Sequence, residues 1–288
     1  MVGRPNVGKS SLVNGLVGRK VAITSSRPQT TRNTIRGVMT ITPDDPTHQV
    51  VLVDTPGLHK PKTALGERLN GLVQGSLAES DVVLFLLDAT QPIGPGDRLV
   101  AERSRASGAP VVVAVNKVDI AEQREVGEML AEASAWEFSA YVPVSAKEGT
   151  GLAELTEELK GRLPEGPLFF PPDMVTDQPD AFMIREIIRE KYLDRLRDEL
   201  PHSLAVDVRD IDERANGTLY VDAALVVERD SQKGIVIGRK GELLRTCGAE
   251  ARKELEVRFG TSVYLDLRVN VEKNWQDKPV LLDRMGFE

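Results

Sequence analysis

The residues whose types and spacing could do chemistry begin at Gly3, where the chain reads Gly-Arg-Pro-Asn-Val-Gly-Lys-Ser. In the pattern Gly-x-x-x-x-Gly-Lys-Ser, the glycines let backbone amides turn inward around the phosphates of a nucleotide. Lys9 would reach the outer phosphates, and the Ser10 hydroxyl would hold Mg²⁺. A pattern with free positions also arises by chance, so this segment alone leaves a coincidental match open.

A second motif, Asp54-Thr-Pro-Gly57, follows the apolar run 49–53. This order places Asp54 at the carboxyl end of a buried strand. A carboxylate there can bind Mg²⁺ through water, and the Gly57 amide can sense a γ-phosphate. Asp-x-x-Gly by itself is more often an ordinary turn, so this motif indicates nucleotide binding only in combination with the other motifs.

Two more motifs could recognise a guanine base. Asn116-Lys117-Val-Asp119 follows the apolar run 110–115, and a carboxylate there can pair with N1–H and the exocyclic amine of guanine, which adenine cannot match. Ser145-Ala146-Lys147 follows residues 141–144 and would give a backbone amide to the guanine oxygen. Four motifs in this order, three at strand ends, predict a GTPase domain. The predicted nucleotide-binding residues are Gly3, Arg4, Pro5, Asn6, Val7, Gly8, Lys9, Ser10, Ser11, Asp54, Thr55, Pro56, Gly57, Leu58, Asn116, Lys117, Asp119, Ser145, Ala146 and Lys147.

Hydrolysis needs further groups around the phosphates. We predict that Thr31 closes on Mg²⁺ when GTP is bound, with Thr30 as the alternative, so Ser10, Thr31 and Asp54 (through water) would hold the metal. The predicted catalytic residues are Lys9, Thr31, Asp54 and Gly57.

Leu58 stands where Ras-like enzymes place a glutamine that orients the attacking water. Leucine has no donor or acceptor, so hydrolysis should be slow and should depend on other groups. The side-chain oxygen of Asn6 could help to hold K⁺ beside the phosphates, in place of an arginine finger. The alternative is that Asn6 is a simple turn residue.

Composition sets limits on the class of protein. The chain has 288 residues, enough for two domains, and with 41% hydrophobic and 28% charged residues it is typical of a globular protein. The formal net charge of −7 argues against nucleic-acid binding by the surface as a whole. The single cysteine, Cys247, excludes an internal disulfide and fits a reducing compartment. No apolar stretch reaches membrane-spanning length, and we expect no signal peptide before the first motif.

The elements that must position these motifs alternate between strand and helix up to about residue 163. Such alternation predicts a doubly wound α/β sheet with ligands at the carboxyl ends of its strands. The predicted strands are 35–41, 49–53, 82–88, 110–115 and 138–144, and the predicted helices follow Lys9 and then lie near 65–79, 96–107, 122–134 and 151–162.

One element of this fold is apparently missing. A central strand, buried on both faces, should precede the phosphate loop, and a strand needs about five residues. Only Met1 and Val2 precede Gly3. We expect a misplaced start with further residues upstream, rather than a deliberate truncation or a natural two-residue stub.

A proline-rich segment, residues 164–180, is predicted to link residues 1–163 to a second domain, residues 181–288. We expect Leu168, Phe169 and Phe170 to fix this linker to one of the domains. The second domain opens with a predicted helix from Ala181 to about residue 199, and strands near 204–210 and 218–228 follow.

A Gly-x-x-Gly turn then separates two helices, in the order α-β-β-α-α-β. This pattern indicates a KH domain, whose glycines let a nucleic-acid backbone pass closely while the groove beside the turn holds about four nucleotides. Residues 229–245 carry five basic and two acidic side chains, a local excess that suits single-stranded RNA. The alternative is a plain turn between helices. The predicted RNA-binding residues are Lys233, Gly234, Ile237, Gly238, Arg239, Lys240, Gly241 and Arg245.

The whole chain resembles the bacterial Era GTPases. The segments that carry the resemblance are 3–10, 28–32, 54–59, 176–179, 187–191, 234–241, 271–275 and 282–287. The fold it implies is a doubly wound P-loop GTPase domain, here without its first strand, followed by an α+β type II KH domain.

The resemblance also implies a function. It implies a cytoplasmic, monomeric GTPase that uses Mg²⁺ and K⁺, binds the 3′ end of 16S rRNA through its KH domain and helps to mature the small (30S) ribosomal subunit. It implies peripheral membrane association for some members, which nothing in these residues supports independently. The alternative is an RNA-binding module whose nucleotide domain, without its first strand, is inactive.

Overall fold

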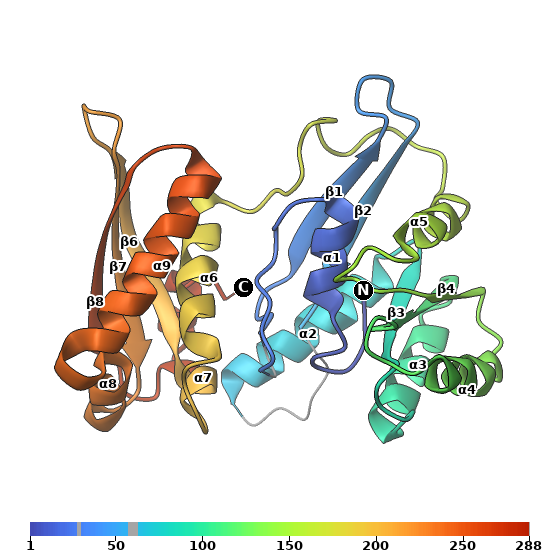
Figure 1. Ribbon diagram of the computed structural model, residues 1–288, viewed down its shortest axis with the longest axis horizontal. Coiled ribbons are helices and arrows are strands. Elements are labelled where there is room, and N and C mark those ends of the chain that lie inside the picture. The colour runs from blue at the N-terminus through green and yellow to red at the C-terminus, as the bar shows by residue number, and fades with distance from the viewer. Residues whose placement is uncertain (28–29, 57–62, 288) are drawn as a thin grey trace. The chain divides into compact units, whose positions relative to one another are not determined.

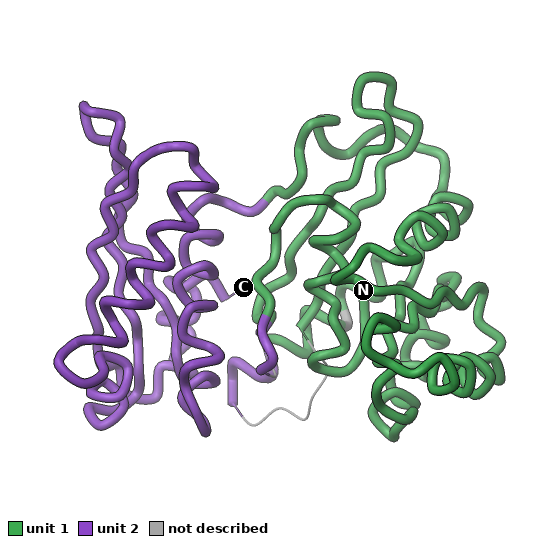
Figure 2. Tube along the Cα trace, viewed as in Figure 1, with its two compact units in different colours: residues 1–24, 31–60, 69–177 green, residues 25–30, 61–68, 178–288 purple. Residues whose placement is uncertain are grey.

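The computed structural model describes residues 1–27, 30–56 and 63–287 (Figure 1). The chain divides into two compact units (Figure 2). The first unit comprises residues 1–24, 31–60 and 69–177, and the second comprises residues 25–30, 61–68 and 178–288. The domain boundaries that the sequence suggests stay a prediction. No helix of the described residues is long and apolar enough to cross a membrane.

The first unit is built on three parallel strands in the order β3 (Val83–Asp88), β4 (Val111–Asn116) and β5 (Ala140–Pro143). Every residue of β3 and β4 is buried, because helices cover both faces of the sheet. One buried cluster joins the sheet to α1 (Lys9–Val17) and α5 (Leu152–Lys160). The other joins it to α2 (Ala64–Ala78), α3 (Pro95–Ala106) and α4 (Gln123–Ser134). The doubly wound α/β fold is thereby confirmed.

A separate antiparallel pair, β1 (Ile35–Ile41) and β2 (His48–Asp54), carries the Asp54 motif at its end. The strand expected before the phosphate loop is represented by a single parallel bridge between Val2 and Phe85. The amide of Val2 donates to the Leu84 carbonyl, and the Leu86 amide donates to the Val2 carbonyl, both at 2.9 Å. Val2 therefore aligns the start of the phosphate loop with the carboxyl half of β3.

The linker contacts the first unit through its backbone. The Gln49 side chain accepts hydrogen bonds from the amides of Phe169 (2.9 Å) and Phe170 (3.0 Å) and donates to the Phe170 carbonyl. The attachment runs through the backbone of Phe169 and Phe170, whereas Leu168 and Phe169 are 41% and 78% exposed. Further along the linker, the Val175 carbonyl accepts from the Val38 amide at 2.8 Å, and Asp177 pairs with Arg36 at 2.9 Å.

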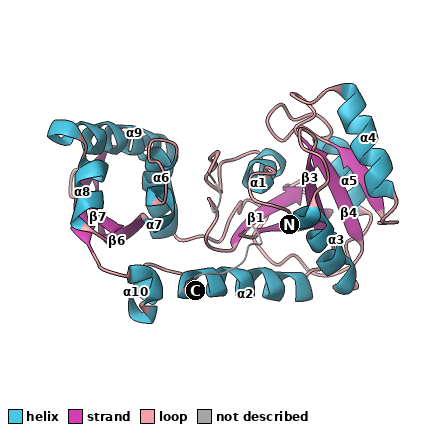
Figure 3. Cartoon of the chain, turned by 90° about the horizontal axis from the view of Figure 1, so that it is seen from below, coloured by secondary structure: helices cyan, strands magenta, loops and turns pink. Residues whose placement is uncertain are grey.

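The second unit has the predicted α-β-β-α-α-β order. Its sheet runs β6 (Ala205–Glu213), β7 (Leu219–Val227), β8 (Val263–Val271), with β7 and β8 parallel. The helices α6 (Asp180–Leu193) and α9 (Glu242–Phe259) cover one face of this sheet (Figure 3). The shorter helical elements are α7 (Leu200–Ser203), α8 (Asp230–Ile237), η1 (Arg239–Gly241), η2 (Trp275–Asp277) and α10 (Pro279–Arg284).

Candidate nucleotide site and nucleic-acid groove

The phosphate loop turns tightly into the start of α1. Gly8 has φ 98°, and a Cβ there would lie 2.2 Å from Nδ2 of Asn116, so no side chain fits. The Lys9 ammonium donates to the carbonyls of Gly3 (3.2 Å) and Arg4 (3.1 Å). Burial lowers the pKa of Lys9, and the charge of Asp54 partly offsets this. These hydrogen bonds hold the Lys9 ammonium over the phosphate loop. The backbone amides at the start of α1 and this ammonium together form an arrangement that suits a phosphate group.

Three oxygen-bearing side chains meet beside this loop. The Oδ2 atom of Asp54 accepts hydrogen bonds from the hydroxyls of Ser10 (2.7 Å) and Thr31 (3.3 Å). The two hydroxyls lie 2.9 Å apart. The alternative, Thr30, instead donates its hydroxyl to the Arg27 carbonyl. The structure therefore brings together the three residues that the sequence suggests for a metal, and Thr31 rather than Thr30 is the one that faces them.

The chemistry of this corner fits Mg²⁺. Burial raises the pKa of Asp54, and the charge of Lys9 and the two hydroxyl hydrogen bonds oppose the shift. The Oδ1 atom of Asp54 is buried and has no hydrogen-bond partner among the described residues. Carboxylate and hydroxyl oxygens are the hard ligands that Mg²⁺ prefers, and an unsatisfied buried acceptor fits a metal-bound water.

The guanine-loop residues lie at the carboxyl ends of β4 and β5. Asn116 links the phosphate loop to the loop after β5. Its side-chain amide donates to the Val7 carbonyl (2.8 Å), and its Oδ1 accepts from the Ala146 amide (3.0 Å). The Ser145 hydroxyl donates to Oδ1 of Asp119 at 2.7 Å. Asp119 is exposed, and the serine fixes its orientation toward solvent. The carboxylate is thus available to the edge of a base.

The sequence reasoning missed Asp88, the last residue of β3. The Lys117 ammonium donates to its Oδ2 at 2.5 Å, and Thr90 donates to its Oδ1. Burial alone would raise the pKa of Asp88, but these hydrogen bonds outweigh burial and hold the pKa below its usual value. An aspartate that ends an apolar run is the signal that identified Asp54, and it could have identified Asp88.

A second missed residue is Asp97, which is fully buried at the start of α3. Its Oδ2 accepts from the Gly94 amide (2.9 Å), and its Oδ1 accepts from Nε of Arg4 (2.7 Å). One carboxylate therefore caps a helix and orients a side chain of the phosphate loop. No local pattern could reveal this pair, because 93 positions separate the two residues.

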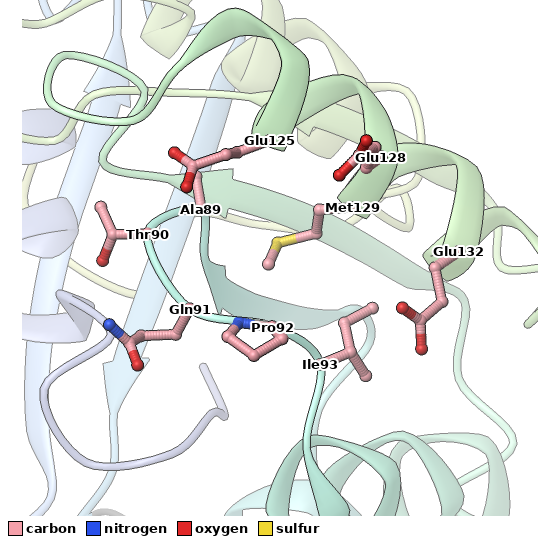
Figure 4. A pocket seen from close by; sticks show the side chains of 9 residues that line it. All are labelled: Ala89, Thr90, Gln91, Pro92, Ile93, Glu125, Glu128, Met129 and Glu132. Carbon is pink, nitrogen blue, oxygen red and sulfur yellow. The ribbon is translucent and has the colours of Figure 1, made fainter.

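A separate pocket of about 210 Å³ lies between the loop after β3 and α4 (Figure 4). Its glutamates have partners within the chain: Glu125 accepts from the Glu122 amide, Glu128 pairs with Arg124, and Glu132 pairs with Arg98. Its lining residues are Ala89, Thr90, Gln91, Pro92, Ile93, Glu125, Glu128, Met129 and Glu132. None of the predicted nucleotide-binding residues lines this pocket.

In the second unit, Gly-x-x-Gly forms the turn between α8 and α9. Gly238 has φ 75° and ψ 174°, and a Cβ there would lie 2.7 Å from Cβ of Leu243. Gly241 has φ 76° and open space around it. Lys240, with φ 52°, stands between them in the exposed turn. Gly238 thus allows the turn to pack, while Gly241 leaves room for a ligand.

A groove of about 430 Å³ begins at this turn and runs between α9 and β8. Of the predicted RNA-binding residues, Gly241 and Arg245 line it. Lys233, Gly234 and Ile237 come from α8 and do not line it, and neither do the turn residues Gly238, Arg239 and Lys240. The sequence reasoning missed Gly248 and Arg252, although their spacing from Gly241 and Arg245 is that of one helix face. The lining residues are Gly241, Leu244, Arg245, Gly248, Ala249, Arg252, Leu265 and Leu267.

Two predicted site residues, Gly57 and Leu58, lie outside the described residues. Asn6 is in the phosphate loop with φ 65°, a conformation that asparagine tolerates better than most residues. The roles assigned to individual site residues stay predictions.

The fold and site define a class of protein, a P-loop GTPase joined to a KH domain. The family model described as "50S ribosome-binding GTPase" matches residues 1–117, and the one described as "KH domain" matches residues 199–276. The chain is 50% identical to GTPase Era of Mycobacterium sp. (strain KMS), over 99% of this chain and 96% of the relative. It is 49% identical to GTPase Era of Mycobacterium tuberculosis (strain ATCC 25177 / H37Ra), over 100% of this chain and 97% of the relative.

Two solved structures are similar along their whole length. An Aquifex aeolicus Era variant bound to GDP.AlF4- has a TM-score of 0.94 and 38% identity, over 99% of this chain and 97% of the other. Era in complex with MgGDPNP and nucleotides 1506–1542 of 16S ribosomal RNA has a TM-score of 0.94 and 37% identity, over 99% of this chain and 96% of the other. The chain belongs to the Era family of GTPases. Its activity is the hydrolysis of GTP, and its second unit contains a KH domain.

Proposed function

We propose that the chain binds single-stranded RNA at the 3′ end of 16S rRNA and assists the assembly and maturation of the small ribosomal subunit. The observation that carries this proposal is the groove beside Gly-x-x-Gly. Gly241 leaves it open at the turn, and Arg245 and Arg252 line it. The relative solved with nucleotides 1506–1542 supports the choice of RNA. The proposal places the chain in the cytoplasm as a monomer; peripheral membrane contact stays a prediction from the resemblance.

The GTPase unit would act with Mg²⁺ held by Ser10, Thr31 and a water on Asp54. The buried, unsatisfied Oδ1 of Asp54 supports this arrangement. Mg²⁺ would neutralise charge on the β- and γ-phosphates. Lys9 would move from the loop carbonyls to the phosphates, because an ammonium gains more from an anion than from neutral carbonyls.

Charge reversal in the turn tests the RNA site. Replacing Arg239 and Lys240 with Asp in the full chain should abolish binding of an oligoribonucleotide copied from the 3′ end of 16S rRNA, measured by fluorescence anisotropy. GTP affinity should not change, because the nucleotide residues lie in the first unit. Binding by the parent should fall with salt by roughly 0.7 log units per phosphate contact for each log unit of salt.

The matched control reverses two exposed cations of the first unit, Arg98 and Arg124, to Asp. It makes the same change in net charge at a distance in sequence from the turn and the groove, so RNA binding should fall only slightly. Equal loss in both double variants would mean that net charge rather than the turn controls binding. If the Arg239/Lys240 variant binds RNA as tightly as the parent, Gly-x-x-Gly is only a turn between two helices.

A role for K⁺ can be tested at Asn6. GTP hydrolysis should be slow and faster in KCl than in NaCl, because a cation beside the phosphates would stabilise developing charge. Asn6→Gly is the sharper variant, since glycine keeps the left-handed backbone at φ 65° while removing the side-chain oxygen. It should erase the difference between the salts, as should Asn6→Ala. Equal parent rates in both salts would exclude the role.

A further inference from the structure

The sheet of the second unit has a face turned away from α6 and α9. Side chains alternate along a strand, so the core residues Val221 and Ala223 of β7 leave Tyr220 and Asp222 on the other face. On β8, Tyr264 pairs in register with Tyr220 and Asp266 pairs with Asp222. We call this the outer face; it carries one row of aromatic rings and one row of carboxylates.

The aromatic row is stacked, with Tyr264 exposed and Tyr220 half-buried. The rings of Tyr220 and Tyr264 have centroids 5.7 Å apart and planes 15° apart, and Tyr264 is 54% exposed. The guanidinium of Arg214, from the β6–β7 hairpin, lies 4.6 Å and 5.2 Å from the two ring centroids. The Arg214 guanidinium therefore already covers part of this row. The electron-rich faces of the tyrosine rings attract cations.

The carboxylate row lies beside it. Asp222 stands in register between Asp210 of β6 and Asp266 of β8. Asp266 pairs with Arg268 at 2.5 Å. The Oδ1 atom of Asp222, in contrast, is buried and has no hydrogen-bond partner among the described residues. Asp222 therefore adds to the middle of the row a carboxylate with one oxygen unpaired within the described part of the chain, and it strengthens the negative charge of the row.

The other half of the outer face is already covered. Ala224 and Val226, the next outward residues of β7, are buried. Arg284 of α10 pairs with Asp207 at 3.3 Å, and Asp207 is the register partner of Ala224. Figure 3 shows α10 on the side of the sheet opposite α9. The open part is thus a bounded patch of two rows near the hairpin.

The charges on this patch select the occupant. The patch carries four aspartates (Asp210, Asp212, Asp222 and Asp266) and two arginines, Arg214 and Arg268, both of which are engaged within the chain. A third arginine, Arg209 in the bulge beside Asp210, pairs with Asp207 at 3.7 Å. Such a patch repels RNA phosphates and attracts cations. We propose that the outer face binds a lysine-rich segment of a protein partner, with ammonium groups over Tyr264 and against Asp222. The KH domain would then hold RNA at its basic groove and a basic protein at its acidic sheet face.

A fluorescein-labelled oligolysine peptide, titrated into the full chain at low salt, tests the proposal by anisotropy. Asp222→Asn with Asp266→Asn should weaken binding about fivefold, and Tyr264→Ala should weaken it about threefold, whereas Tyr264→Phe should not. Carbodiimide cross-linking joins lysine amines to touching carboxylates, and mass spectrometry should place the cross-links on Asp222 and Asp266. Tyr264 is half exposed, so its variants should remain folded, which thermal melting checks.

The matched control is Glu128→Gln with Glu132→Gln, which removes two exposed carboxylates from the first unit. Equal weakening in both double variants, or cross-links spread over many acidic residues, would reduce the binding to general attraction by a chain of net charge −7 and overturn the proposal. A labelled oligouridylate serves as the second probe. If Tyr264→Ala weakens its binding and leaves the peptide unaffected, the outer face stacks bases and the protein partner is excluded.

Discussion

At the scale of single residues, we predict that Asp119 determines base choice. The Ser145 hydroxyl donates to one of its oxygens at 2.7 Å, an orientation in which the carboxylate would accept two hydrogen bonds from guanine. Asp119→Asn should weaken GTP binding by about 2–4 kcal/mol and should favour xanthosine triphosphate, because an amide cannot accept both guanine hydrogens. Competition binding with the two nucleotides measures both effects.

Glu148→Gln is the control for this change, since Glu148 is an exposed carboxylate near the same loop and pairs only loosely with Lys147, at 3.6 Å. It should leave the preference for GTP intact. GTP affinity that stays unchanged in the Asp119 variant would refute its role in reading the base.

The Asp88–Lys117 pair gives a prediction that depends on pH. The pKa of Asp88 is held below its ordinary value of 3.8, so its charge stabilises the fold above that pH and this contribution is lost as pH falls through the lowered pKa. Asp88→Asn should cost about 1–2 kcal/mol at neutral pH, because the pair is only partly buried.

Urea unfolding of parent and variant between neutral pH and pH 3 measures this contribution. The difference in free energy of unfolding should shrink at the acid end. A constant difference would mean that packing, not the charge of Asp88, stabilises the loop. The variant should also bind GTP more weakly, because Lys117 would lose the partner that orients it for the predicted contact with the base.

At the scale of elements, the two glycines of the α8–α9 turn should behave differently. Gly238→Ala places a Cβ against Leu243 in a backbone region that is almost restricted to glycine, so the second unit should lose at least about 2 kcal/mol of stability. Gly241→Ala meets no atom within 4 Å and should cost about 1 kcal/mol, through its left-handed φ alone.

The effect on RNA binding should be the opposite: among folded molecules, Gly241→Ala should weaken RNA binding more than Gly238→Ala does. Gly241 lines the groove, so an added methyl group would block the close approach that we propose for the RNA backbone. Thermal melting and anisotropy, done on both variants, separate the two effects. If Gly241→Ala binds RNA as well as the parent, the backbone does not pass over this end of the turn.

At the scale of the whole molecule, each unit contains one of the two tryptophans, so each can be followed separately. Trp136 stacks on Phe85 in the first unit, and Trp275 stacks on Phe287 in the second. Mg²⁺ with GDP at a hundred times its Kd should stabilise the nucleotide unit by about 2.7 kcal/mol and raise its Tm by about 5–10 °C.

Trp275→Phe leaves Trp136 as the only reporter, and Trp136→Phe leaves Trp275. Nucleotide should shift the melting curve reported by Trp136, while RNA should shift the one reported by Trp275. Equal shifts of both curves with either ligand would show that the two units unfold as one cooperative body.

The sequence by itself determined the class of protein and the order of its elements. Gly-x-x-x-x-Gly-Lys-Ser, the polar residues after apolar runs and Gly-x-x-Gly are local patterns, and local patterns reflect backbone geometry that neighbouring residues set. The same reasoning predicted Ser10 and Asp54 as partners, because parallel strands and the loop between strand and helix end at one edge of the sheet.

Only the tertiary structure decided the contacts between residues far apart in the chain. Asp88 and Lys117 are 29 positions apart, and Arg4 and Asp97 are 93 apart. The choice of Thr31 over Thr30 also depends on which hydroxyl the backbone turns toward Asp54. The outer-face rows exist because β7 and β8 pair in one particular register, and register follows from packing the core rather than from the composition of either strand.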